Sequence, residues 1–230
     1  MTTATKTPIS LYEQYRPSTW AQLVGQDKAI AKINALRLRG LAGRCYWISG
    51  LSGTGKTSIA YLIAREIADP LSITEMAADE LTGEYLINLK STIRLYGGLW
   101  GSGKSAKAYI WNEAHGLSKR CVRLLLDMTE HGLPAHVAII FTTTADGMKL
   151  FEDCHIDASP LLSRCVEIHL AQRDLAKPFA ERCHEIACKE GLNGRPIADY
   201  VKLAQKCGNN FRAMLQQVDM GAMMTKGVEA

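Results

Sequence analysis

A glycine-rich segment, set between an apolar run and a helical run, constrains the fold of this 230-residue chain more than any other feature. Residues 50–57 (GLSGTGKT) match the pattern G-x-x-x-x-G-K-[ST]. The run CYWIS at 45–49 predicts a buried strand before the segment, and SIAYLIAREIA at 58–68 predicts a helix after it. In this setting, the backbone N–H groups of the loop and the helix N-terminus surround phosphate groups. The three elements therefore predict an α/β fold that binds a nucleoside triphosphate, with ATP as the first expectation.

The residues expected to bind the nucleotide form one continuous stretch. Lys56 can reach the β- and γ-phosphates, and the Thr57 hydroxyl can bind Mg²⁺. ATP and Mg²⁺ are therefore the predicted cofactors. The cofactor-binding residues of the stretch are Gly50, Leu51, Ser52, Gly53, Thr54, Gly55, Lys56, Thr57 and Ser58.

The same pattern occurs a second time, at residues 98–105 (GLWGSGKS). This match runs directly into the apolar run AYIW at 108–111, which predicts a strand. No helix begins after the second loop, so no helix N-terminus faces a phosphate there. We interpret residues 98–105 as a glycine-rich connection.

Two polar residues follow the strand predicted at 108–111 and supply the second half of the site. Asn112 and Glu113 should project from the carboxyl edge of the sheet, where ligands bind in α/β folds. Glu113 is the candidate base that polarises an attacking water. Asn112 stands where most such sites carry Asp; its oxygen accepts a hydrogen bond from a metal-bound water but brings no charge. We therefore expect an ATPase with weak Mg²⁺ binding and slow hydrolysis.

The rest of the chain predicts two domains. Strands that alternate with helices as far as Leu170 indicate a parallel sheet with helices on both faces. After that point, helical patterns follow one another without a strand and predict a small all-helical lid. Further strands are expected at 137–141 and 165–170, and helices at 27–38, 85–96, 119–130, 174–190, 196–207 and 210–224. The expected boundaries are a flexible N-terminus at 1–10, the nucleotide-binding domain at 11–171, the lid at 172–224 and a flexible tail at 225–230.

Composition excludes some classes of protein and leaves others open. No apolar run approaches the roughly 20 residues that span a bilayer, and the N-terminus lacks the apolar core of a signal peptide. Seven cysteines without framework spacing favour free thiols in a reducing compartment. We therefore expect a cytoplasmic protein, nucleoid-associated if bacterial, with no membrane partner. A formal net charge of +4 permits DNA as a partner without requiring it.

An ordered set of short motifs runs from about Leu11 to Val218, which is nearly the whole chain. The motifs are Tyr15-Arg16-Pro17, Val24-Gly25-Gln26, the loop at 50–57, YIWNEAHGLS at 109–118, FTTT at 141–144, Ser163-Arg164-Cys165 and GNNFRAML at 208–215. Each motif is weak alone, but together they resemble the AAA+ clamp-loader ATPases. These include the small subunits of replication factor C and the bacterial polymerase III gamma/tau subunit.

The resemblance assigns roles to residues outside the loop. It implies that Tyr15, Arg16, Pro17, Val24 and Gly25 lie against the adenine. Thr144 would sit near the γ-phosphate as sensor 1, and Arg212 would reach the phosphates from the lid as sensor 2. Arg164 would act as a finger on the nucleotide of a neighbouring subunit, where a guanidinium stabilises the transferring phosphoryl group.

The resemblance also implies partners. It predicts self-association or association with related AAA+ subunits in a ring or filament, binding to DNA, and a sliding clamp as a further candidate partner. The implied activity couples ATP binding and hydrolysis to assembly or remodelling on DNA in replication or repair. Arg94, Lys119 and Arg120 are the candidate contacts to DNA phosphates.

The chain departs from the family pattern in four places. Asn112 is the first, and the segment at 146–159 is longer than the usual link and has no assigned role. The sequence stops soon after the lid, so we expect no C-terminal collar, and this leaves the oligomeric state open. Residues 46–120 contain no Cys, so the zinc insert of bacterial gamma/tau subunits is not expected.

Two alternative functions remain open at this point. One is a weakly hydrolysing or non-hydrolysing ATP-binding switch, in which the nucleotide orders an interface. The other is a helper ATPase of a mobile element, which would use the same core without a sliding clamp. The sequence does not determine the hydrolysis rate, the DNA structure that is preferred, or whether a clamp is the partner.

Overall fold

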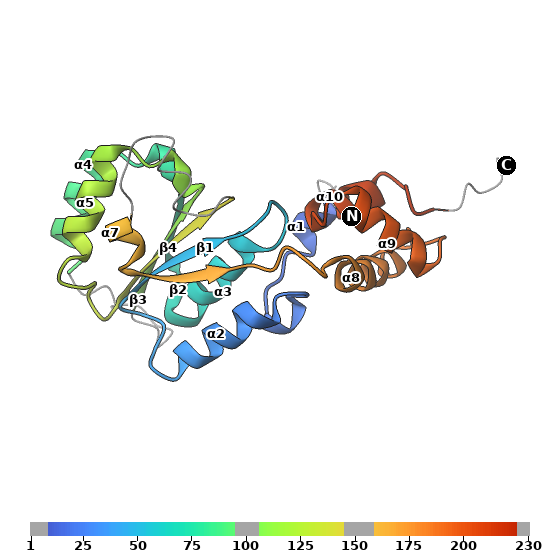
Figure 1. The fold of residues 1–230 in the computed structure, drawn as a ribbon, viewed down its shortest axis with the longest axis horizontal. Helices are drawn as coiled ribbons and strands as arrows, with labels where there is room; N and C mark the ends of the chain where they lie inside the picture. Colours follow the sequence, from blue (N-terminus) through green and yellow to red (C-terminus); the bar gives the residue numbers. More distant parts are fainter. Residues whose placement is uncertain (1–8, 95–105, 145–158, 225–230) are drawn as a thin grey trace, which may run out of the picture. The chain divides into compact units, whose positions relative to one another are not determined.

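The computed structural model describes residues 9–94, 106–144 and 159–224, which fall into two compact units (Figure 1). Gln26–Ala171 form an α/β unit. Met1–Gly25 and Gln172–Ala230 together form a helical unit. The second match to the phosphate-loop pattern, at 98–105, and nearly all of the segment at 146–159 lie outside the described residues.

A parallel sheet forms the centre of the α/β unit. Its described strands are β1 (Arg44–Ser49), β2 (Ala68–Ala77), β3 (Ala106–Asn112), β4 (Val137–Thr143) and β5 (Cys165–His169). They lie in the order β2-β3-β4-β1-β5, and every pair in that order is parallel. The predicted parallel sheet is therefore confirmed.

Strand β2 was not predicted from the sequence. Asp69 and Pro70 indicated only the end of the preceding helix, but the chain continues there into an extended strand. The strand lies at the edge of the sheet, where a proline is tolerated because its missing N–H need not face a partner strand. The pairing of β2 with β3 shifts register between Ala68 and Ile73, at the position of this proline.

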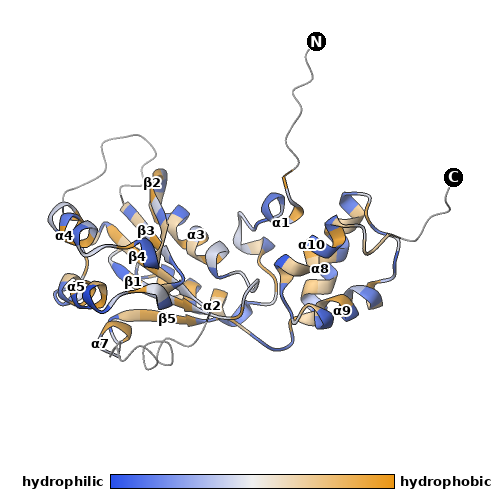
Figure 2. Ribbon diagram, turned by 90° about the horizontal axis from the view of Figure 1, so that it is seen from above, coloured by the Kyte–Doolittle hydropathy of each residue, from blue (hydrophilic) through white to orange (hydrophobic). Residues whose placement is uncertain are grey.

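Helices cover both faces of the sheet, as predicted (Figure 1). α2 (Asp27–Arg37) and α3 (Lys56–Ile67) pack on one face, and α4 (Gly83–Thr92), α5 (Lys119–Thr129) and the short α7 (Ser159–Leu162) pack on the other. Short 3-10 helices occupy Ala78–Glu80 and Ala114–Gly116 in this unit and Trp20–Gln22 in the helical unit. Figure 2 shows hydrophobic residues concentrated on the strands, whereas α4 and α5 carry both hydrophilic and hydrophobic residues.

Three aromatic side chains form the centre of the core between the sheet and α4 and α5. Trp47 lies beside Phe141 in register, and Phe141 lies beside Trp111, so the three residues share one row and one face of the sheet. The ring centroid of Phe141 is 5.3 Å from that of each tryptophan, and all three side chains are fully buried. Leucines of α4 and α5, among them Leu86 and Leu125, belong to the same buried cluster.

The helical unit contains α1 (Leu11–Gln14), α8 (Ala176–Lys189), α9 (Ile197–Lys206) and α10 (Phe211–Asp219). Phe179 of α8 packs against Phe211 of α10 with ring centroids 5.2 Å apart. The two runs that form α8 and α9 have strong helical periodicity, and both helices agree closely with the predicted ranges. This part of the chain is all-helical, as expected.

Residues 11–25 differ from the expected division of the chain, which placed them in the nucleotide-binding domain. In the structure they belong to the helical unit. The Tyr15 hydroxyl donates a hydrogen bond to Glu190, which raises the pKa of Tyr15, and the Lys189 ammonium lies 5.4 Å from the Tyr15 ring. Gly25 has a φ of 72°, and a Cβ there would come within 2.7 Å of Leu175. These contacts join residues about 150 or more positions apart in the chain, which local sequence patterns do not reveal.

Phe141→Ala should lower the free energy of unfolding by about 3–5 kcal/mol, because it leaves a cavity between two buried tryptophans. Leu71→Ala is the matched control, since Leu71 is 96% exposed on β2 and should change stability by less than about 0.5 kcal/mol. Urea unfolding of each variant, followed by circular dichroism, measures both values. Equal losses for the two variants would contradict this description of the core.

Candidate functional site

The loop at 50–57 has the backbone that a phosphate-binding turn requires. Gly53 and Gly55 have φ values of 72° and 101°, a region that glycine adopts without steric strain. Gly55 is the N-cap residue of α3, and no side chain caps the helix. The first N–H groups of α3 therefore need another acceptor, and the partial positive charge of the helix end favours an anion.

Lys56 folds back into this loop. Its ammonium donates to the backbone carbonyl oxygens of Gly50 and Leu51, each at 3.0 Å, and the residue is almost fully buried. The Thr54 hydroxyl donates to the same Leu51 oxygen at 2.7 Å. A buried ammonium held by neutral carbonyl groups gains electrostatic stabilisation from an anionic partner. The loop is thus shaped to receive phosphate oxygens.

Gln26 ties the loop to the end of the sheet. Its side chain is buried, donates to the Thr54 carbonyl oxygen at 3.3 Å and accepts from the Ala171 N–H at 2.8 Å. Gln26 lies within the Val24-Gly25-Gln26 motif but was not among the predicted site residues. The motif was the available signal, and its positioning role depends on a contact 145 residues away along the chain.

Asn112 is held on both sides of its amide at the end of β3. The Thr142 hydroxyl, from β4, donates to Asn112 Oδ1 at 2.8 Å. Asn112 Nδ2 donates to Glu75 Oε1 at 2.6 Å, and Glu75 comes from β2. Sequence reasoning missed Thr142 and Glu75. Thr142 lies within the FTTT run at 141–144, of which only Thr144 was predicted as a site residue, and no local pattern marks Glu75, because its role follows from the strand order.

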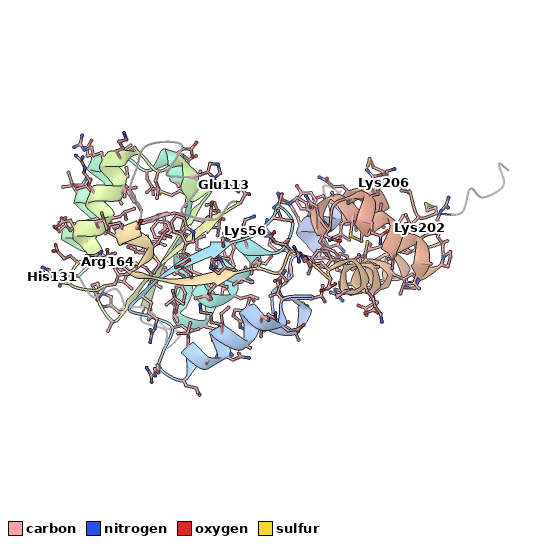
Figure 3. The ribbon with its side chains drawn as sticks, viewed as in Figure 1. Lys56, Glu113, His131, Arg164, Lys202 and Lys206 are labelled. Atoms are coloured by element: carbon pink, nitrogen blue, oxygen red, sulfur yellow. The ribbon has the colours of Figure 1, made fainter. Side chains whose placement is uncertain are left out.

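Glu113 and Thr144 lie at the same edge of the sheet as the loop. Glu113 has φ 54° and ψ 55°, a conformation that costs a non-glycine residue about 1–3 kcal/mol and is often found at functional sites. Its side chain is half exposed, and Oε2 lies 3.4 Å from His115 Nδ1. Thr144 directly follows β4, and the Gly50 N–H donates to the preceding carbonyl oxygen, that of Thr143, at 3.3 Å. Figure 3 shows Lys56 and Glu113 toward this end of the sheet.

Arg164 lies at the opposite edge of the sheet. It directly precedes β5, which runs parallel to β1, whereas the loop follows β1. Its guanidinium donates to the Pro160 carbonyl oxygen at 2.6 Å and lines a pocket of about 190 Å³ together with Arg44 and Thr129. Figure 3 shows Arg164 and Lys56 at opposite ends of the α/β unit. The structure does not bring this arginine to the loop of its own chain.

Several predicted site residues belong to the helical unit: Tyr15, Arg16, Pro17, Val24, Gly25 and Arg212. Within that unit, the Arg212 guanidinium lies 5.7 Å from the centroid of the Tyr12 ring. The expected contacts of these residues with adenine or phosphate stay predictions.

The three candidate DNA contacts do not form one cluster. α4 and α5 lie side by side and run in the same direction: Arg120 lies over Gly83 at their N-terminal ends, and Lys90 pairs with Asp127 near their C-terminal ends. Arg94 follows α4, so it lies at the other end of this helix pair from Lys119 and Arg120. If DNA contacts all three residues, it must extend along both helices.

The residues at the carboxyl edge fit a magnesium ion. Thr57 provides a hydroxyl in the first turn of α3, and Glu75 and Glu113 provide carboxylates, which are the hard oxygen ligands that Mg²⁺ prefers. Among the described residues, no group of three or more His, Cys, Asp and Glu side chains could hold a metal ion, so a bound nucleotide and water would have to complete the coordination of Mg²⁺. The part of the chain that the structure describes also contains no helix long and apolar enough to cross a membrane.

Gln26→Ala should lower the free energy of unfolding by about 1–3 kcal/mol, because it leaves the Thr54 carbonyl and the Ala171 N–H without their buried partner. Gln205→Ala, at an exposed position of α9, controls for the loss of an amide that does not contact the loop. Thermal and urea unfolding measure the difference. A Gln26→Ala protein as stable as the control would show that this bridge adds nothing to the fold.

Comparisons with known proteins agree with this geometry. A family model described as the TIP49 P-loop domain matches residues 10–96. The chain is 30% identical to the DNA polymerase III subunit tau of Salmonella typhimurium over 246 aligned positions, which cover 96% of this chain and 36% of that protein. It is 29% identical to subunit tau/gamma of Haemophilus influenzae, with 93% and 32% covered. The chain thus spans about a third of the length of these curated relatives.

Solved structures share the fold. A mutant RuvB from Thermotoga maritima superposes with a TM-score of 0.68 at 20% identity, covering 89% of this chain and 64% of that one. A second RuvB mutant gives a TM-score of 0.64 at the same identity and coverage. The parallel sheet, the phosphate-binding loop after its first strand and the polymerase III relatives all agree. The chain therefore belongs to the AAA+ P-loop proteins of clamp-loader-like type.

Proposed function

We propose that this chain binds ATP with Mg²⁺, hydrolyses it, and as an oligomer couples that cycle to assembly or remodelling on DNA. The observation that carries the proposal is the loop at 50–57, in which a buried Lys56 and the uncapped start of α3 face the same turn. Glu113 and Thr144 lie at the same edge of the sheet. The presence of binding donors and a candidate base at one edge of the sheet supports this proposal.

Each residue has a distinct task in this proposal. Lys56 and the first N–H groups of α3 bind the phosphates, and Thr57 contributes its hydroxyl to the metal. Glu113 orients and polarises the attacking water, and Thr144 contacts the γ-phosphate. Mg²⁺, when bound, neutralises phosphate charge.

Arg164 supports an oligomeric form of the enzyme. Strand β5 has five residues, so Arg164 lies about 16 Å or more from the carboxyl edge at about 3.3 Å per residue. A guanidinium side chain does not span that distance within the chain. Arg164 can therefore act on a nucleotide only in a neighbouring subunit, of this or a related AAA+ protein.

DNA is a proposed binding partner, and a sliding clamp is a further candidate partner. The support is the similarity to DNA polymerase III subunits together with three basic residues, Arg94 just after α4 and Lys119 and Arg120 at the start of α5. Phosphate contacts need such charges and no particular base sequence. Because these residues lie at the two ends of the α4–α5 pair, DNA that contacts all three would run along both helices.

A second candidate function is an ATP-binding switch with little or no hydrolysis. Asn112 favours it, because the residue that usually brings negative charge to the metal is neutral here. The two candidates predict the same nucleotide affinity and differ in turnover.

Lys56→Ala should weaken binding of a fluorescent ATP analogue by about 10-fold or more, because one charge-assisted phosphate contact contributes about 1.5–3 kcal/mol. The control is Lys202→Ala, which removes an exposed lysine of α9. Fluorescence titration measures both affinities. Equal affinities for the two variants would contradict phosphate binding at the loop.

Arg164→Ala and Lys56→Ala should each lose most ATPase activity alone, and a mixture of the two should recover part of it, because the intact loop of an Arg164→Ala subunit can meet the intact Arg164 of a Lys56→Ala neighbour. Arg123→Ala, which removes an exposed arginine of α5, should keep wild-type turnover on its own. Steady-state turnover is measured across mixing ratios at constant total protein. A mixture no more active than the sum of its two components would exclude a finger that acts between subunits.

A further inference from the structure

We propose that Glu75 supplies the metal-facing carboxylate that Asn112 does not, and that Asn112 and Tyr61 hold it in place. The inference rests on the proposed function, since it concerns the Mg²⁺ of the same nucleotide site. Under this inference, the negative charge of the site comes from Glu75 on β2 instead of from position 112 on β3.

The strand order places Glu75 beside the end of β3. β2 pairs with β3 so that Ala77 lies opposite Asn112 and Glu75 lies opposite Ile110. Glu75 thus lies diagonally across from Asn112, two residues back along the edge strand, within reach of a long side chain. The 2.6 Å hydrogen bond from Asn112 Nδ2 to Glu75 Oε1 shows that the side chain does reach.

The hydrogen bonds around Asn112 fix which way its amide faces. The Thr142 hydroxyl donates to Oδ1 at 2.8 Å, so the NH₂ group faces Glu75. An ionised carboxylate only accepts hydrogen bonds, so it requires a donor at that point. Asn provides the donor, whereas Asp at position 112 would place a second carboxylate against Glu75. Two carboxylates in contact repel one another and favour a protonated form.

A third side chain orients Glu75 from the nucleotide-binding helix. The Tyr61 hydroxyl, from α3, donates to Glu75 Oε2. Tyr61 lies four residues after Thr57, and side chains at this spacing lie on the same face of a helix. The Glu75 carboxylate is therefore held between Asn112 at the end of β3 and Tyr61 of α3. Tyr61 lies on the same face of α3 as Thr57, the candidate metal ligand.

Glu75 retains capacity for a metal shell after these contacts. A carboxylate offers about four acceptor positions, and Asn112 and Tyr61 occupy two. The residue is exposed, so water reaches it. Mg²⁺ in phosphate sites keeps several waters and takes one or two carboxylates, so Glu75 would accept hydrogen bonds from metal-bound water or bind the ion directly.

The test measures how Mg²⁺ changes nucleotide affinity, so it does not depend on turnover. A fluorescent ATP analogue is titrated in EDTA and across Mg²⁺ concentrations, and Mn²⁺ binding to the protein–nucleotide complex is followed by electron paramagnetic resonance. Glu75→Gln keeps an oxygen that accepts from Asn112 but removes the charge. It should weaken metal affinity of the complex by about 10- to 100-fold and leave the affinity in EDTA within about twofold.

A charge exchange gives the decisive comparison. The double variant E75Q/N112D returns one carboxylate to the site, at position 112, and should recover most of the metal affinity that Glu75→Gln loses. Tyr61→Phe removes one orienting donor and should give an intermediate loss. Glu130→Gln, at an exposed position after α5, should match wild type. Unfolding temperatures of all variants show whether each is folded.

The outcomes separate this inference from the proposed function. If Glu75→Gln binds the analogue with wild-type dependence on Mg²⁺, Glu75 serves only to satisfy the amide of Asn112 and the inference is wrong, while ATP binding stands. If N112D raises metal affinity above wild type and E75Q/N112D raises it by the same amount, Glu75 adds nothing to metal binding. The metal charge then belongs at position 112, and this result also overturns the inference. If wild type binds no analogue with or without metal, the proposed function fails and takes the inference with it.

Discussion

Parallel pairing of β1 with β4, and of β4 with β3, is the interaction on which the rest of the site depends. In a parallel sheet every strand ends at the same edge, so residues far apart in sequence meet there. The loop after β1, Glu113 after β3 and Thr144 after β4 converge for this reason. The same rule separates Arg164 from them, because a residue that precedes a parallel strand must lie at the opposite edge.

The sheet can serve as a rigid support because its faces are filled. Phe141 between Trp47 and Trp111 fixes the spacing of β1, β4 and β3 through large buried rings, and α4 and α5 cover them. On the other face, α3 begins at Lys56 and packs its apolar residues against β3 and β4. The helix that presents its N-terminus to a phosphate is therefore held by the same sheet that carries Glu113.

The polar contacts at the carboxyl edge form one connected set. Thr142, Asn112, Glu75 and Tyr61 come from three strands and a helix, and each donates to or accepts from the next. Such a set makes the neutral residue at 112 compatible with a charged site, since the amide can donate to a carboxylate that Asp would repel. Gln26 adds a second bridge, from the loop to the end of β5.

The sequence by itself determined the local features: the loop at 50–57, the strands around it, the helices on both faces and the helical region after Leu170. These follow from apolar periodicity and glycine placement within a few residues, which is why β1, β3, β4 and β5 and most helices agree with expectation. Only the tertiary structure revealed β2, whose Asp69-Pro70 start is typical of a break and is tolerated because the strand lies at an edge. It alone grouped residues 11–25 with the helical unit and placed Glu75 against Asn112. The physical reason is the same in each case: these contacts join segments about 40 to 180 positions apart, and strand order and packing, not local pattern, decide which segments meet.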